Sequence, residues 1–171
     1  TKAFIVLQDG RIVLEQYFGS FTRDSIWYWA SAGKTLTAFL VGIAQRDRIL
    51  SINDSTSHYL GAGWTSCPAD KERLITVLHQ LTMTSGLQDF VADPYCTLPE
   101  CLLYQADAGM RWAYHNAPYT LLDKVVEKAS GQTYNQYFLA KIRLRTGMNG
   151  FWIQSGYNNV YFSNARSMAR F

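Results

Sequence analysis

The sequence predicts a mixed α and β fold, with strands near both ends of the chain and helices between them. Strand-like apolar runs bounded by turn signals lie near residues 3–18 and 151–162, whereas residues 31–145 show mostly helical spacing of apolar side chains. The 171 residues are 48% hydrophobic and 15% aromatic, enough to bury the core of one domain. No internal repeat or low-complexity segment divides the chain, so residues 1–171 are interpreted as a single domain of the α/β, mixed α+β, class.

The first elements are a strand hairpin and a long helix. Strands are predicted at residues 3–7 and 12–18, because Asp9-Gly10 between them is a strong signal for a tight hairpin turn. A polar loop and an aromatic segment then lead into a helix from residue 31 to about residue 47. The apolar face of that helix comprises Leu36, Phe39, Leu40 and Ile43.

The remaining elements follow from local patterns. Helical segments are predicted at residues 71–81, 117–131, 134–143 and from 164 onward, with strands at 151–153 and 160–162. Gly86 is interpreted as the stop after the first of these helices. Asn116 and Ser163 are interpreted as N-caps of the helices that follow them.

Charge and composition exclude several classes of function. The net charge is +3, with acids and bases interspersed, which argues against a nucleic-acid partner. No apolar run approaches the length of a transmembrane helix. The three histidines, His58, His79 and His115, show no metal-ligand spacing, so neither a metal nor a cofactor is expected.

Ser31 and Lys34 are the strongest candidates for chemistry. They are three residues apart, so both project to one side of a helix, and a desolvated lysine amine can accept the serine proton. This is the S-x-x-K arrangement of a serine nucleophile with a lysine partner. The alternative is a serine N-cap followed by a solvated lysine. A phosphate-binding loop ending at Gly33 is excluded, because Tyr28 occupies the position where that loop requires glycine.

Three segments in order carry a resemblance to a known family. They are Ser31-x-x-Lys34, the segment 84–87 with the sequence T-S-G-L, and Tyr114-x-Asn116. Together they resemble the penicillin-recognising serine hydrolases, a β-lactamase-related family, and within it the branch of class C β-lactamases, esterases and D-peptidases. In that branch S-x-x-K is the first motif and Y-x-N the second. The resemblance covers essentially the whole chain.

The resemblance implies a fold, an activity and a set of roles. The fold would be β-lactamase/transpeptidase-like, an antiparallel sheet flanked by helices with a mostly helical subdomain. The activity would be hydrolysis of an ester, a β-lactam or a D-amino-acid peptide through an acyl-serine intermediate. Ser31 would be the nucleophile, Lys34 and Tyr114 would share the proton transfer, and Asn116 would bind the substrate and orient Lys34. The Ser31 backbone N–H would be one oxyanion donor.

The family's third motif, a Lys or His followed by x-Gly on an edge strand, is absent from these 171 residues. No residue here can be assigned its roles, the second oxyanion donor and the positive group for a substrate carboxylate. We therefore expect the chain to be an incomplete portion of its domain, with the remainder C-terminal to residue 171.

Other residues near the motifs leave alternatives open. His115 is expected either to be an ordinary core or surface histidine or to edge the cleft. Ser85 is expected to have a turn role, and Arg166 and Arg170 to form a solvated helix face. A second Y-x-N at residues 157–159 lies between predicted strands without a following helix. The aromatic residues that flank the motifs, either core residues or a wall for an apolar acyl group, are Trp27, Tyr28, Trp29 and Trp112.

The three cysteines bear on location. Cys96 and Cys101 are close together in a proline-containing loop, so we expect them to form a disulfide and Cys67 to be free. A disulfide implies a periplasmic or otherwise secreted protein. The alternative is three reduced thiols in a cytoplasmic enzyme.

Two other functions compete with the hydrolase. A catalytically silent ligand-binding or sensor domain can share the same fold, because fold does not imply activity. An unrelated interaction domain with chance motifs is the third hypothesis. Formation of a covalent adduct with the serine distinguishes the first from the other two.

Overall fold

The computed structural model describes residues 1–171 and contains five strands and nine α-helices. The strands are β1 (Ala3–Gln8), β2 (Arg11–Tyr17), β3 (Trp27–Tyr28), β4 (Phe151–Ser155) and β5 (Asn158–Ser163). The helices are α1 (Gly33–Arg46), α2 (Ser57–Leu60), α3 (Ala69–Glu72), α4 (Val77–Leu81), α5 (Asn116–Thr120), α6 (Leu122–Ser130), α7 (Tyr134–Phe138), α8 (Leu144–Thr146) and α9 (Ala165–Arg170). Short 3₁₀ turns span Ala30–Ala32 and Pro99–Cys101, and a π-helical turn spans Leu139–Arg143.

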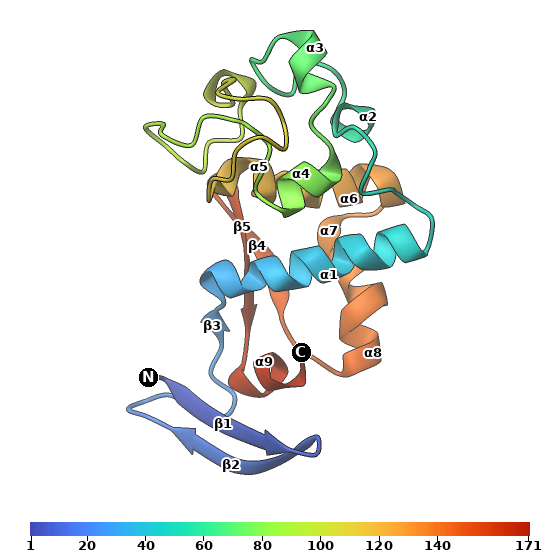
Figure 1. Cartoon of the computed structure of the whole chain (residues 1–171). Coiled ribbons are helices and arrows are strands. Elements are labelled where there is room, and N and C mark those ends of the chain that lie inside the picture. Colours follow the sequence, from blue (N-terminus) through green and yellow to red (C-terminus); the bar gives the residue numbers. More distant parts are fainter.

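The strands form two sheets, both antiparallel, in agreement with the antiparallel pairing that the resemblance implies. β1 pairs with β2, and β3, β5 and β4 form a three-stranded sheet in that order. Asp9 and Gly10 both have positive φ, 51° and 74°, as the predicted tight hairpin turn requires. Figure 1 shows α1 crossing the middle of the molecule, with most of the other helices at one end and the β1–β2 hairpin at the opposite end.

The main core lies where α1, α6 and α7 pack against the three-stranded sheet. Leu36, Leu40 and Ile43 on α1 are buried, in agreement with the predicted apolar face, although Phe39 of that face is exposed. From the sheet, Trp152 and Tyr161 enter the same cluster. Each fully buried aliphatic side chain contributes about 1.5–3 kcal/mol relative to an exposed one, so this contact fixes α1 on the sheet.

The prediction of a single helix over residues 71–81 is wrong, because the chain forms two short helices there, α3 and α4. Thr76 has an extended backbone (φ −95°, ψ 165°), which separates α3 from α4. Its hydroxyl accepts a hydrogen bond from the His79 N–H, and its own N–H donates to the His79 ring. The capping box makes Thr76 the start of a new helix. The second of these helices, α4, ends at Leu81, so Gly86 is not its stop. Gly86 has φ +78° and lies close to the Ala106 carbonyl, and its lack of a side chain allows the turn at this point.

Two predictions about the C-terminal region are wrong for a shared reason: distant residues bind the side chains concerned. Ser163 does not cap α9, because its hydroxyl accepts a hydrogen bond from Trp29 Nε1 at 2.6 Å, and Asn164 caps the helix instead. Arg166 is not purely a solvated residue, although its side chain is 39% exposed. It donates two hydrogen bonds to the Glu15 carboxylate, at 2.6 and 2.5 Å, and so joins α9 to the hairpin.

Arg170, the other arginine of the expected solvated face, donates a hydrogen bond to the Gly147 carbonyl. The helical segment predicted at 134–143 continues through the π-helical turn and α8, and it ends at Gly147 in the left-handed conformation. Gly131 ends α6 in the same way, as predicted.

Cys96 and Cys101 form the predicted disulfide, and Cys67 is free. Cys96 lies in the irregular loop from Asp89 to Glu100, and Cys101 is the last residue of the 3₁₀ turn Pro99–Cys101. That loop is docked on α5, because Ala117 N–H donates to the Pro94 carbonyl at 3.1 Å. No helix of the protein combines the length and the apolar character needed to cross a membrane.

Candidate active site

Ser31 and Lys34 lie at the junction of the 3₁₀ turn and α1. Ser31 makes no capping hydrogen bond, so the N-cap interpretation of this serine is wrong. Ala30 directly before it has φ +47°, a left-handed conformation that costs energy for any residue with a Cβ. Lys34 Nζ lies 3.5 Å from Ser31 Oγ, so the one-turn spacing brings the two groups together as predicted.

Tyr114 and Asn116 reach the same point from the extended stretch before α5. The Tyr114 hydroxyl donates a hydrogen bond to Ser31 Oγ at 2.8 Å, and Lys34 Nζ donates to Asn116 Oδ1 at 2.9 Å. Asn116 is the first residue of α5 and not its N-cap, because His115 occupies that position and the Asn116 side chain is bound to Lys34. We call these four residues, Ser31, Lys34, Tyr114 and Asn116, the serine cluster.

Tyr119 supports Lys34 in a way that the sequence did not reveal. Its hydroxyl donates to the Lys34 carbonyl at 2.8 Å, and its ring centroid lies 5.6 Å from Lys34 Nζ. The Tyr114 ring centroid lies 5.3 Å from the same ammonium. Both rings attract the cation through their negative faces. The only available signal was the helical spacing of Tyr119, three residues after Asn116 on α5.

The electrostatics of the serine cluster favour proton transfer. Burial by itself would raise the pKa of the Tyr114 phenol, but the hydrogen bond with Ser31 and the Lys34 ammonium outweigh it, and the pKa falls below its ordinary value. A lowered pKa increases the fraction of Tyr114 that is ionised, and the phenolate is the form that can take the serine proton. Both Lys34 Nζ and the Tyr114 hydroxyl contact Ser31 Oγ, so the geometry does not single out either group as the base.

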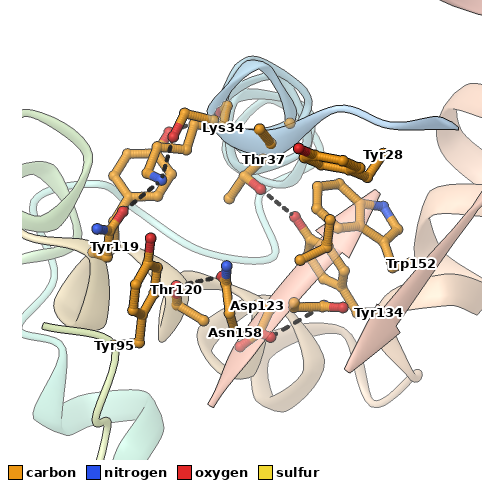
Figure 2. A pocket seen from close by; sticks show the side chains of 16 residues that line it. Tyr28, Lys34, Thr37, Tyr95, Tyr119, Thr120, Asp123, Tyr134, Trp152 and Asn158 are labelled. Atoms are coloured by element: carbon orange, nitrogen blue, oxygen red, sulfur yellow. Dashed lines mark hydrogen bonds between the residues drawn. The ribbon is translucent and has the colours of Figure 1, made fainter. Parts of the chain in front are cut away.

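A cavity of about 210 Å³ opens beside the serine cluster. Figure 2 shows Lys34, Thr37 and Tyr28 on one side of it and Asp123, Asn158 and Tyr134 on the other. Tyr134 donates to Thr37 Oγ1 at 2.8 Å, and Thr120 donates to Asn158 Oδ1 at 3.3 Å. We call Thr120, Asp123, Asn158 and Asn159 the cavity floor.

The second Y-x-N segment therefore has a different place from the first. Asn158 and Asn159 begin β5 and line the cavity floor, where Asn159 Nδ2 donates to Asp123 at 3.2 Å. Neither residue bonds to Ser31 or Lys34. The sequence pattern alone gave no reason to place these asparagines in the site.

The other expectations resolve individually. His115 is 2% exposed and has no hydrogen-bond partner on either ring nitrogen, so it is a core residue and does not edge the cavity. Burial lowers its pKa. Ser85 is buried and accepts a hydrogen bond from the Leu87 N–H, in agreement with a turn role. Trp29 is a core residue, Tyr28 lines the cavity, and Trp112 is 65% exposed.

Comparison with known proteins decides the family. The sequence model of the family described as Beta-lactamase matches residues 2–171, nearly the entire chain. The chain belongs to the beta-lactamase family. The sequence is also 27% identical, over 142 residues, to penicillin-binding protein 4* of Bacillus subtilis (strain 168). The aligned residues make up 74% of this chain and 30% of the Bacillus protein.

Solved structures share the beta-lactamase family fold. A putative beta-lactamase from Bacteroides dorei DSM 17855 is 24% identical, with a TM-score of 0.79 over 99% of this chain and 55% of its own. A putative 6-aminohexanoate-dimer hydrolase from Bacillus anthracis is 16% identical, with a TM-score of 0.82 over 99% and 52%. A D-stereospecific amidohydrolase from Streptomyces sp. is 18% identical, with a TM-score of 0.73 over 92% and 63%. The chain thus spans about half the length of the first two and somewhat more of the third.

Proposed function

We propose that the protein is a serine hydrolase that cleaves an ester, a β-lactam or a D-amino-acid peptide through an acyl-Ser31 intermediate. The observation that carries the proposal is the contact between the Tyr114 hydroxyl and Ser31 Oγ at 2.8 Å, with Lys34 Nζ 3.5 Å from the same oxygen. Asn116 holds Lys34 by a 2.9 Å hydrogen bond. A serine hydroxyl in contact with two groups that can exchange a proton with it is the arrangement that an activated serine nucleophile requires.

The reaction proceeds in two balanced halves. Ser31 Oγ attacks the substrate carbonyl while its proton passes to the Lys34–Tyr114 pair, and the same pair then delivers that proton to the leaving group. The Ser31 N–H lies in the first turn, where helix N–H groups have no intrahelical acceptor, so it is free to stabilise the oxyanion. Water then attacks the acyl carbonyl and gives one proton to the Lys34–Tyr114 pair, and the pair returns a proton to Ser31 Oγ as the bond from Ser31 to the acyl carbon breaks and the acid is released.

The test is hydrolysis of a panel of nitrophenyl esters, a chromogenic cephalosporin and D-alanyl peptides by the full chain. Turnover of at least one class that is lost in Ser31→Ala supports the proposal. The matched control is Ser20→Ala, an exposed serine in the turn after β2, which retains turnover. Reversible binding of a β-lactam without turnover or adduct would instead support the silent ligand-binding domain.

We also propose a periplasmic or secreted location. The Cys96–Cys101 disulfide supports it, because disulfides persist in oxidising compartments. Alkylation of the protein in intact cells, before any reductant is added, should modify one cysteine of the three. Modification of all three would contradict this location.

A further inference from the structure

Asp123 on the cavity floor is a charged residue that the proposed chemistry does not use. It lies in the first turn of α6 and is 6% exposed. Lys34 and Asp123 are the only charged residues that line the cavity. The cavity is therefore polarised, with an ammonium beside Ser31 and a carboxylate on the floor. Figure 2 shows the two on opposite sides, with Asp123 between Asn158 and Tyr134.

The Asp123 carboxylate is only partly compensated by the protein: the charge and the backbone N–H of Lys124 favour its ionised form, but burial outweighs them. Its one side-chain partner is Asn159 Nδ2 at 3.2 Å, a neutral donor. It takes part in none of the ion pairs, and the neighbouring Lys124 is paired with Glu127 at 2.9 Å. Burial raises the pKa of Asp123 to about 6, so the group is still mostly ionised at neutral pH. A buried carboxylate without a cation is unfavourable, and a bound cation would relieve that penalty.

The walls of the cavity suit a cation as well. Aromatic side chains line it on several sides, namely Tyr28, Tyr95, Tyr119, Tyr134 and Trp152. Aromatic faces attract organic ammonium groups, and the attraction is strongest where water is excluded. Asn158 and Thr120 add hydrogen-bonding atoms at the floor. An alkyl chain between aromatic walls that ends in an ammonium at Asp123 matches this distribution of charge and apolar surface.

We propose that Asp123 is a specificity-determining residue that binds a primary ammonium on the acyl part of the substrate, so that the preferred substrates are esters or amides of amino acids with a free amine. This inference rests on the proposed hydrolase function of Ser31. The two charges of the cavity orient such a substrate: the Lys34 ammonium repels the amine, and the Asp123 carboxylate attracts it. The carbonyl is then left at Ser31. The alternative is that Asp123 only holds β5 on α6 through Asn159.

The first measurement uses matched esters on the full chain. The pairs are p-nitrophenyl 3-aminopropanoate with butanoate, and 6-aminohexanoate with heptanoate, which differ only in a terminal ammonium or methyl group. For at least one pair we expect a preference for the amine of about tenfold or more in kcat/KM, mainly through KM. Asp123→Asn, which keeps the size of the side chain, should abolish the preference, because kcat/KM for the amine ester falls about tenfold more than for the alkyl ester. Asp70→Asn, an exposed acid on α3, is the control for net charge and retains the preference.

The second measurement is independent of catalysis. The dissociation constant of n-butylammonium, with 1-butanol as its neutral counterpart, is measured by calorimetry on the full chain. Asp123→Asn should weaken butylammonium binding about fivefold or more and leave butanol unchanged. Asp123→Asn could lower kcat/KM equally for amine and alkyl esters, or leave the dissociation constant of butylammonium unchanged. Either result would overturn this inference and indicate a purely structural role for Asp123. Asp123-dependent binding of the amine without hydrolysis of any ester would instead contradict the hydrolase proposal and leave the ammonium site standing.

Discussion

The serine cluster and the cavity floor face each other across one cavity but differ in how completely their polar groups are partnered. In the serine cluster, Ser31 contacts both Tyr114 and Lys34, and Lys34 also binds Asn116. On the floor, the Asp123 carboxylate has a single neutral side-chain partner. The difference indicates that the proposed reacting groups are already ordered without substrate, whereas the floor retains an interaction that a ligand can complete.

The largest expected effect on activity comes from substituting Lys34 or Tyr114 in the serine cluster. Lys34→Ala and Tyr114→Phe should each lower kcat/KM about 10²- to 10⁴-fold, the usual scale of positioned proton transfer. Because the two groups act as a unit, the double variant should be little worse than either single variant. Steady-state kinetics on the substrate found for the wild type, with circular dichroism to check the fold, make the measurement. Fully multiplicative losses would show that the two residues act in separate steps.

Local patterns predicted the parts of the molecule in which the interacting residues are close in sequence. Asp9-Gly10 predicted the first hairpin, Gly131 the end of α6, and the one-turn spacing the contact of Ser31 with Lys34. The order of the motifs then predicted that Tyr114 and Asn116 join them, through a resemblance and not through any local signal.

The wrong predictions concern side chains that could interact either locally or with a residue distant in sequence, and that bind the distant residue in the structure. Asn116 was expected to cap its own helix but binds Lys34, 82 positions away. Ser163 is bound by Trp29, at a separation of 134 positions, and Arg166 by Glu15, at a separation of 151. Asp123 looked like any polar residue in a first helical turn, since only the packing of β5 against α6 places it on the cavity floor. No local pattern carries such information.

A second prediction concerns the effect of Asp123, on the cavity floor, on the free energy of unfolding. The pKa of Asp123 rises from 3.8 to about 6 because of burial, with Lys124, Glu127 and Asn159 as the other groups that face it. The native state therefore binds the proton more tightly than the unfolded chain, so the free energy of unfolding falls as pH rises through this interval. Asp123→Asn should stabilise the protein at pH 8 by on the order of a few kcal/mol, and hardly at all at pH 3.5. Thermal unfolding of both proteins at the two pH values is the measurement. A loss of stability at pH 8 would mean that the carboxylate is better compensated than its contacts indicate.

The smallest expected effect concerns His115, which lies between two members of the serine cluster but outside the cavity. Burial lowers its pKa from 6.5, with Asp89 and Arg111 as the charged groups nearby. The unfolded chain takes up the proton first, so His115 reduces stability as pH falls below 6.5. His115→Phe leaves no ring nitrogen without a partner and should raise the melting temperature at pH 5 by about 2–4 °C, with a smaller change at pH 8. Its kcat/KM should stay within a few-fold of the wild type. A large loss of activity in a folded variant would place His115 among the groups that act on substrate.

The most direct test of Ser31 as the nucleophile is the mass of the intact full chain after brief incubation with a slowly released covalent serine reagent, such as a phosphonylating fluorophosphonate or an acylating β-lactam. We expect one adduct per chain, located by peptide mapping on the peptide that contains Ser31. It should be absent in Ser31→Ala and form more slowly in Tyr114→Phe. An adduct that persists in Ser31→Ala, or one that maps to another residue, would contradict the assignment of Ser31 as the nucleophile.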